Sequence, residues 1–213
     1  MKKNLLSIAF VLVNLFASAQ KPEFIQSMGE TLGQFATCRN VADFQALGNK
    51  FKMISEVENS EWLPLYYHAH CYIIMSFMEP TDAVKKDSYL DEAEKSIQKL
   101  ITMVPTEVEV YALQSFYFTA RLVVNPVERG QKFGGLAGQA IGKALALDPS
   151  NLRARLIKLQ MDLGTARFFG QDPASFCPQA KELLASWDSF KPKSAIYPAW
   201  GKDQVEGIVK GCL

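Results

Sequence analysis

Apolar residues recur at intervals of three and four along most of the chain after residue 20, a pattern typical of amphipathic α-helices. In one such stretch Trp62, Leu65, Ala69, Tyr72 and Ser76 share a helical face. Sustained apolar/polar alternation and Asn-Gly or Asp-Gly hairpin turns are absent from the sequence, so strands are not expected. The pattern therefore predicts an all-α protein. The expected helices cover residues 23–37, 40–56, 61–78, 86–104, 107–124, 132–147, 151–169, 174–190 and 195–210.

Three of these helices repeat one arrangement of small, large and proline residues. In each, Ala is followed by a second position four residues later, a third three residues after that, and proline after five more. The three sets are Ala93, Ile97, Leu100 and Pro105; Ala137, Ile141, Ala144 and Pro149; and Ala180, Leu184, Trp187 and Pro192. Small beside large residues on one face allow close packing of antiparallel helices, and proline ends each helix. The repeat predicts successive helical hairpins.

This arrangement resembles the second helix of the tetratricopeptide (TPR) repeat, and the sequence ALALDPSN at 144–151 is similar to that family's repeat junction. The resemblance covers residues 57–192. It implies a right-handed α-hairpin solenoid of about four helical pairs with a C-terminal capping helix. The repeats are 44 and 43 residues apart, not the family's roughly 34. We expect the additional residues in loops near 79–86, 125–133 and 169–174.

The first 19 residues have the three parts of a secretory signal. Lys2 and Lys3 precede an apolar run over residues 5–16, which ends in Ala17-Ser18-Ala19. Cleavage after residue 19 of 213 leaves 194 residues, which we expect to form a single TPR-like domain over 20–213. We therefore predict an exported protein that is located in the periplasm, with secretion as the alternative. No stable membrane insertion of the mature chain is expected, because no later segment approaches the roughly 18 apolar residues of a membrane span.

Composition excludes two classes of protein. Hydrophobic residues make up 48% of the chain and aromatic residues 11%, which is sufficient for a packed core and argues against disorder. The formal charge is +1, and removal of Lys2 and Lys3 changes it to −1. A nearly neutral chain gives no basis for binding nucleic acid through its phosphates.

His68 and His70 are the only histidines of the sequence, and Cys71 follows them. Residues two apart on a helix point about 200° away from each other, so both imidazoles cannot easily bind one ion. His68 and Cys71 could share a face, but two ligands do not make a zinc site. We predict no catalytic residue, no metal site and no cofactor. The alternative is an exported hydrolase or metal-binding protein that uses His68, His70 and Cys71.

The segment over residues 130–142 is rich in glycine, but its spacing does not match a phosphate-binding Walker loop. Gly134, Gly138 and Gly142 recur every four residues and would clear one face of a helix. We expect a neighbouring helix to pack closely there.

Four cysteines remain after export into a compartment where disulfides persist. If the last two helices run antiparallel about a turn near residue 193, Cys177 lies level with about residue 209. Cys212 is three residues further, or about 4.5 Å along the helix axis. We predict a disulfide between Cys177 and Cys212. Cys38 and Cys71 are either buried thiols or a second bond.

The TPR resemblance implies a concave surface, lined by the first helix of each pair, that receives a protein or peptide partner. The candidate binding residues on these helices are Gln114, Tyr117, Arg121, Arg155, Lys158 and Asp162. For each of them an ordinary solvated helix face is the simpler interpretation. We predict a non-enzymatic exported protein that mediates protein or peptide binding, and a structural role in the envelope is a further possibility.

Overall fold

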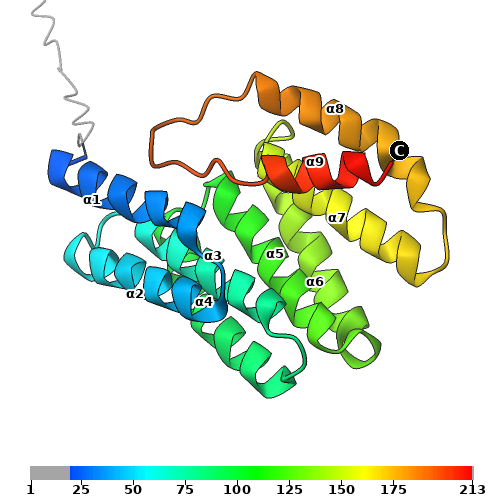
Figure 1. Cartoon of the computed structure of the whole chain (residues 1–213), viewed down its shortest axis with the longest axis horizontal. Coiled ribbons are helices and arrows are strands. Elements are labelled where there is room, and N and C mark those ends of the chain that lie inside the picture. The colour runs from blue at the N-terminus through cyan, green and yellow to red at the C-terminus, as the bar shows by residue number, and fades with distance from the viewer. Residues whose placement is uncertain (1–19, 213) are drawn as a thin grey trace, which may run out of the picture.

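The computed structural model describes residues 20–212, and within that range it contains nine α-helices, two short 3₁₀ helices and no strand (Figure 1). The helices are α1 (Pro22–Gly33), η1 (Gln34–Thr37), α2 (Val41–Val57), α3 (Leu63–Met78), α4 (Ala83–Met103), α5 (Val108–Val124), α6 (Pro126–Leu147), α7 (Leu152–Phe168), η2 (Pro173–Phe176), α8 (Cys177–Asp188) and α9 (Lys202–Lys210). The predicted all-α class is confirmed. The predicted secretory signal, residues 1–19, lies outside the described residues.

Neighbouring helices along the chain pack against each other, and the chain advances from α1 and α2 at one end to α8 and α9 at the other (Figure 1). Helix α3 packs between α2 and α4, and α5 packs against α4 and α6. Helices α3 and α5 also contact each other, as do α5 and α7. The first helices of three successive pairs therefore lie next to one another.

The core is divided into three clusters that follow one another along the chain. The largest joins α1 to α5, the second joins α5, α6 and α7, and the third joins α7, α8 and α9. Most of the repeated Ala and large residues lie in these clusters. Ala93, Ile97, Leu100, Ala137 and Ile141 are all buried. Each helical pair thus buries its apolar face against its neighbours.

Helix α6 begins at Pro126, six residues before its predicted start, and the expected loop over 125–133 is wrong. Asn125 forms the N-cap, and its side-chain oxygen accepts a hydrogen bond of 3.3 Å from the N–H of Glu128. Proline is favourable in a first helical turn because its missing N–H would have no intrahelical partner there. The additional residues of this repeat lengthen the helix to 22 residues.

The glycines of α6 do not make the close approach that their spacing predicted. A Cβ atom on Gly138 or Gly142 would meet nothing within 4 Å, and one on Gly134 would lie 3.5 Å from Leu122 Cδ1. Alanines bring α6 and α5 together instead. Ala137 is buried, and its carbonyl accepts a hydrogen bond of 3.0 Å from Ser115 Oγ on α5.

The predicted helix over 195–210 begins only at Lys202. Residues 189–201, which we call the C-terminal strap, run without helix between α8 and α9 and bury Ile196 and Tyr197. The strap lies against α3, where Tyr67 Oη donates to the Ile196 carbonyl over 3.0 Å. It turns into α9 at Gly201, whose φ of 114° is in the left-handed region that favours glycine. Figure 1 shows this long connection.

Cys177 and Cys212 form a disulfide with a Cα–Cα distance of 5.8 Å, which confirms the predicted bond. It joins the start of α8 to the residues after α9 and indicates an oxidising, extracytoplasmic compartment. Cys38 and Cys71 are free thiols in this structure, and Cys71 is buried. Within residues 20–212, no helix combines the length and the hydropathy needed to cross a bilayer.

Candidate functional site

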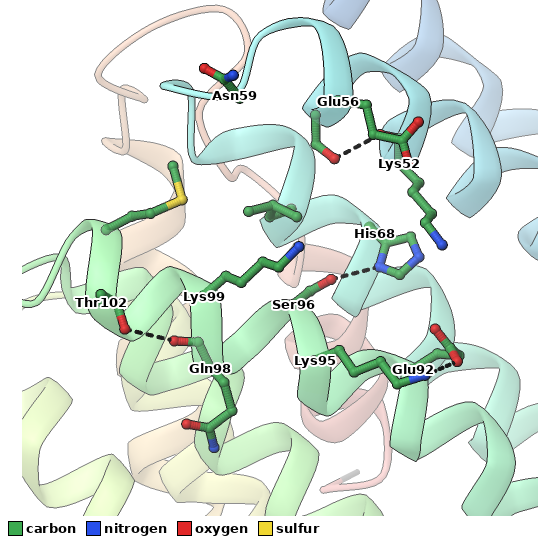
Figure 2. Close-up of a pocket in the computed structure, with 13 residues that line it drawn as sticks. Lys52, Glu56, Asn59, His68, Glu92, Lys95, Ser96, Gln98, Lys99 and Thr102 are labelled. Atoms are coloured by element: carbon green, nitrogen blue, oxygen red, sulfur yellow. Dashed lines mark hydrogen bonds and ion pairs between the residues drawn. The ribbon is translucent and has the colours of Figure 1, made fainter.

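A pocket of about 670 Å³ lies between α2, α3 and α4 (Figure 2). This volume is within the range of about 300–1,000 Å³ that is usual for small-molecule sites. Helix α2 and the turn after it, the first half of α3, and one face of α4 supply its walls. The lining residues are Lys52, Ser55, Glu56, Asn59, Leu65, His68, Glu92, Lys95, Ser96, Gln98, Lys99, Thr102 and Met103.

His68 lines this pocket and is buried, with 3% of its surface exposed. Its Nδ1 is 2.8 Å from Ser96 Oγ on α4, and its ring centre is 4.7 Å from that of Tyr72. Burial lowers the pKa of His68 to about 4, because a charged imidazole would lose its hydration there, and Lys52 adds to the effect. The imidazole is therefore uncharged at neutral pH.

Two lysines give the pocket its positive character. Figure 2 shows the side chains of Lys52, from α2, and Lys99, from α4, reaching to either side of His68. Neither ammonium group has an ion-pair partner within the described part of the chain, whereas Lys95 pairs with Glu92. Glu56 is the one remaining carboxylate of the lining. The unpaired lysines favour a ligand that carries carboxylates.

The rest of the pocket offers apolar surface. Leu65 and Met103 supply aliphatic and thioether groups, and the long methylene stems of the lysines add to them. An apolar wall flanked by two unpaired ammonium groups suits an amphipathic ligand with a hydrophobic body and acidic ends. His68 Nδ1 and Ser96 Oγ in this lining are 2.8 Å apart, and the lining as a whole is suited to binding.

His70 points to different surroundings from His68, as expected for residues two apart on a helix. Its ring is stacked 4.6 Å from Trp200 of the strap, and burial lowers its pKa to about 3. The Cys71 thiol is buried, which raises its pKa well above the usual value. The three residues do not form one site, and the described residues contain no group of three side chains placed to hold a metal ion.

The six side chains proposed as a partner-binding surface take part in separate contacts. Tyr117 is buried, and its Oη accepts a hydrogen bond of 2.9 Å from Arg121. Arg121 in turn pairs with Asp87 on α4 over 2.8 Å and also contacts Asp91 and Glu94.

The other members of that set lie elsewhere. Arg155 donates to Glu182 on α8 over 2.7 Å, and Lys158 pairs with Asp162 one turn along α7. Gln114 is half-buried on α5. The structure does not bring the six residues together.

Part of the first-helix surface is covered by the chain itself. Trp200 Nε1 of the strap donates to Tyr66 Oη on α3 over 2.9 Å, and Tyr197 Oη donates to Glu107 over 2.7 Å. Trp200 also packs near Phe116 on α5. The strap therefore occupies surface of α3 and α5 that could otherwise face a partner.

Among the pocket residues, His68 is the one that the sequence marks as a candidate for chemistry. A signal was present on α4, where Glu92, Ser96, Lys99 and Met103 follow one another at spacings of four, three and four on one face. The role of Lys52 had no such signal, because it lies on a different helix, 47 positions before Lys99 in the sequence.

One solved structure gives a strong comparison. The chain is similar to the HusA haemophore from Porphyromonas gingivalis, with a TM-score of 0.78 and 28% sequence identity, over 91% of this chain and 94% of that chain. No protein-family model matches the sequence, and no curated protein sequence matches it. The comparison supports the all-helical fold and a role in binding.

Proposed function

We propose that this protein is an exported, non-enzymatic haem-binding protein of the haemophore type. The observation that supports the proposal is the similarity to a haemophore over nearly the whole of both chains. The disulfide between Cys177 and Cys212 is consistent with a location outside the cytoplasm, where disulfides persist. We place the protein in the periplasm, with secretion as the alternative.

The pocket between α2, α3 and α4 is the proposed haem site. Haem combines a flat, largely apolar macrocycle with two propionate carboxylates. Lys52 and Lys99 would pair with the propionates, and Leu65 and Met103 would contact the ring. Ion pairs at such a partly exposed site are individually modest, so the apolar contact supplies much of the affinity.

His68 would form the floor of this site. Its side chain is almost completely buried, and one ring nitrogen is already taken by Ser96. We infer that the macrocycle is held through its ring and carboxylates rather than through its iron. Metal-free protoporphyrin should therefore bind as well as haem does.

The haem proposal is compatible with a TPR-like arrangement of the helices. We propose that α3 to α8 form a right-handed, TPR-like hairpin solenoid, which is supported by the contacts of α3 with α5 and of α5 with α7. A protein or peptide partner on its concave face, contacted by residues such as Gln114, Arg155 and Lys158, is a second hypothesis. It is less favoured, because the strap already covers part of α3 and α5.

Absorbance titration of the purified protein with haem tests the function, and paired variants test the site. Lys52→Ala/Lys99→Ala should weaken haem binding at least tenfold, which corresponds to about 1.4 kcal/mol. Lys132→Ala/Lys181→Ala, which removes two exposed lysines outside the pocket, should bind as the parent does. Absence of saturable haem binding by the parent protein would refute the function. Equal affinities of the two double variants would refute the site.

A further inference from the structure

A second, smaller pocket of about 170 Å³ lies where the starts of α5 and α7 meet the C-terminal strap. Ser150, Arg153, Lys191, Lys193 and Tyr197 are among its lining residues. A water molecule takes about 30 Å³ in the liquid, so this pocket can hold a small ion with a few waters. It is too small for a ligand of the size proposed above.

Arg153 is the central group of this pocket. The side chain is 1% exposed, its Nε donates to Glu109 Oε2 over 2.7 Å, and its guanidinium lies 4.8 Å from the centre of the Phe190 ring. Among the described residues, however, its Nη1 has no hydrogen-bond partner. A sealed, charged donor without an acceptor is costly. A buried guanidinium nitrogen in the wall of a pocket therefore points to an acceptor from outside the chain.

The first turn of α7 adds further donors at the same place. Asn151 caps this 17-residue helix by accepting from the Ala154 N–H over 2.9 Å. The N–H groups of Leu152 and Arg153 have no intrahelical acceptor, as in the first turn of any α-helix. The start of a helix carries partial positive charge and favours anions.

The charged residues of the lining are mainly basic. Lys191 and Lys193 are exposed on the strap, and Lys193 Nζ is 3.5 Å from Glu107 Oε2. Asp148 is the single carboxylate among the lining residues, and its Oδ1 accepts from the N–H and the hydroxyl of Ser150. These two hydrogen bonds partly satisfy the Asp148 carboxylate within the turn. Lys191 and Lys193 leave the entrance of the pocket positively charged.

We propose that this pocket binds a small oxyanion, a carboxylate or an inorganic phosphate. Arg153 and the first turn of α7 hold the anion, and Lys191 and Lys193 attract it at the entrance. The proposal is independent of haem binding, because none of these residues lines the pocket between α2, α3 and α4.

Calorimetric titration of the purified protein with sodium phosphate and, separately, with sodium acetate tests this proposal. Saturable binding is expected in at least one titration, and the tighter anion identifies the source as a phosphate or a carboxylate. Lys191→Ala/Lys193→Ala should weaken this binding at least tenfold and leave haem binding unchanged. Both lysines are exposed, so the helical circular dichroism spectrum should be that of the parent.

The matched control is again Lys132→Ala/Lys181→Ala, which should bind the anion as the parent does. The proposal is overturned if neither anion binds at millimolar concentration. It is also overturned if the Lys191→Ala/Lys193→Ala variant binds the anion as tightly as the control does.

Discussion

The two histidines of α3 are buried as neutral imidazoles, and this makes the stability of the protein dependent on pH. Burial lowers the pKa of His68 to about 4 and that of His70 to about 3, both below the unfolded value of about 6.5. The unfolded chain therefore binds protons near pH 6.5 that the folded chain does not bind. Stability should fall as the pH drops from 7.5 toward 4.

Each histidine should contribute a loss of about 2 kcal/mol between pH 7.5 and 5. His70→Phe, which replaces an imidazole lacking a partner at Nδ1 by an apolar ring, should remove about half of this dependence. Urea unfolding of the parent and the variant at pH 7.5, 6 and 5 measures the difference. Identical pH dependence in the two proteins would contradict the account.

Glycine positions on α6 provide a second test at the scale of single residues. Gly138 and Gly142 are exposed, lie inside a helix, and have open space where a Cβ would stand. Alanine should therefore raise the free energy of unfolding by about 0.5–1 kcal/mol at each position, because glycine loses more backbone entropy on folding. Thermal unfolding of Gly138→Ala/Gly142→Ala measures the sum. A lower melting temperature would show that another group packs closely against this face of α6.

Sequence reasoning succeeded at residues whose environment follows from local geometry. The different directions of His68 and His70 follow from the helical period alone, and the repeated alanines mark real contacts. It failed for the glycines of α6 because periodicity shows which residues share a face but not what that face meets. Periodicity could not show that Lys52 and Lys99 line the same pocket, because they lie on different helices.

At the scale of elements, the last two helices are joined both by the strap and by a disulfide. Cys177 and Cys212 are 35 positions apart in the sequence. Closing a loop of this length stabilises the folded state by about 3–4 kcal/mol on the chain-entropy model. Cys177→Ser/Cys212→Ser should lose that amount in a urea unfolding experiment.

Because of the strap, we expect removal of the disulfide to destabilise mainly α9 and the segment before it. Trp200 and Ile196 contact α3, so fraying of α9 would also release the cover over Tyr66 and Tyr67. Hydrogen exchange of the serine variant should therefore speed up in α9 and the strap before it does in α4 or α5. Uniformly faster exchange throughout the molecule would argue against a local effect of the disulfide.

Helix positions were predictable because the amphipathic period and the prolines are local signals. The strap was not predictable. Ile196, Tyr197 and Trp200 have the apolar spacing of a helix, but their partners are on α3 and α5, more than 70 residues away. Tertiary contacts, together with Pro198 and the left-handed Gly201, determine the conformation of this segment.

At the scale of the whole molecule, the core leaves a pocket of about 670 Å³ between α2, α3 and α4. The sequence alone favoured a protein or peptide as the partner, since the repeat pattern specifies architecture rather than ligand. The similarity to a haemophore and the unpaired lysines of the pocket shift that expectation toward a small, acidic, largely apolar ligand.

Amide NMR titration with metal-free protoporphyrin tests this central proposal most directly, because it reports both binding and location without a paramagnetic iron. Saturable shifts are expected at Lys52, Leu65, Ser96 and Lys99, with little change around Arg153 on α7. Shifts confined to α7, α8 and α9, or no saturable shifts at all, would contradict it.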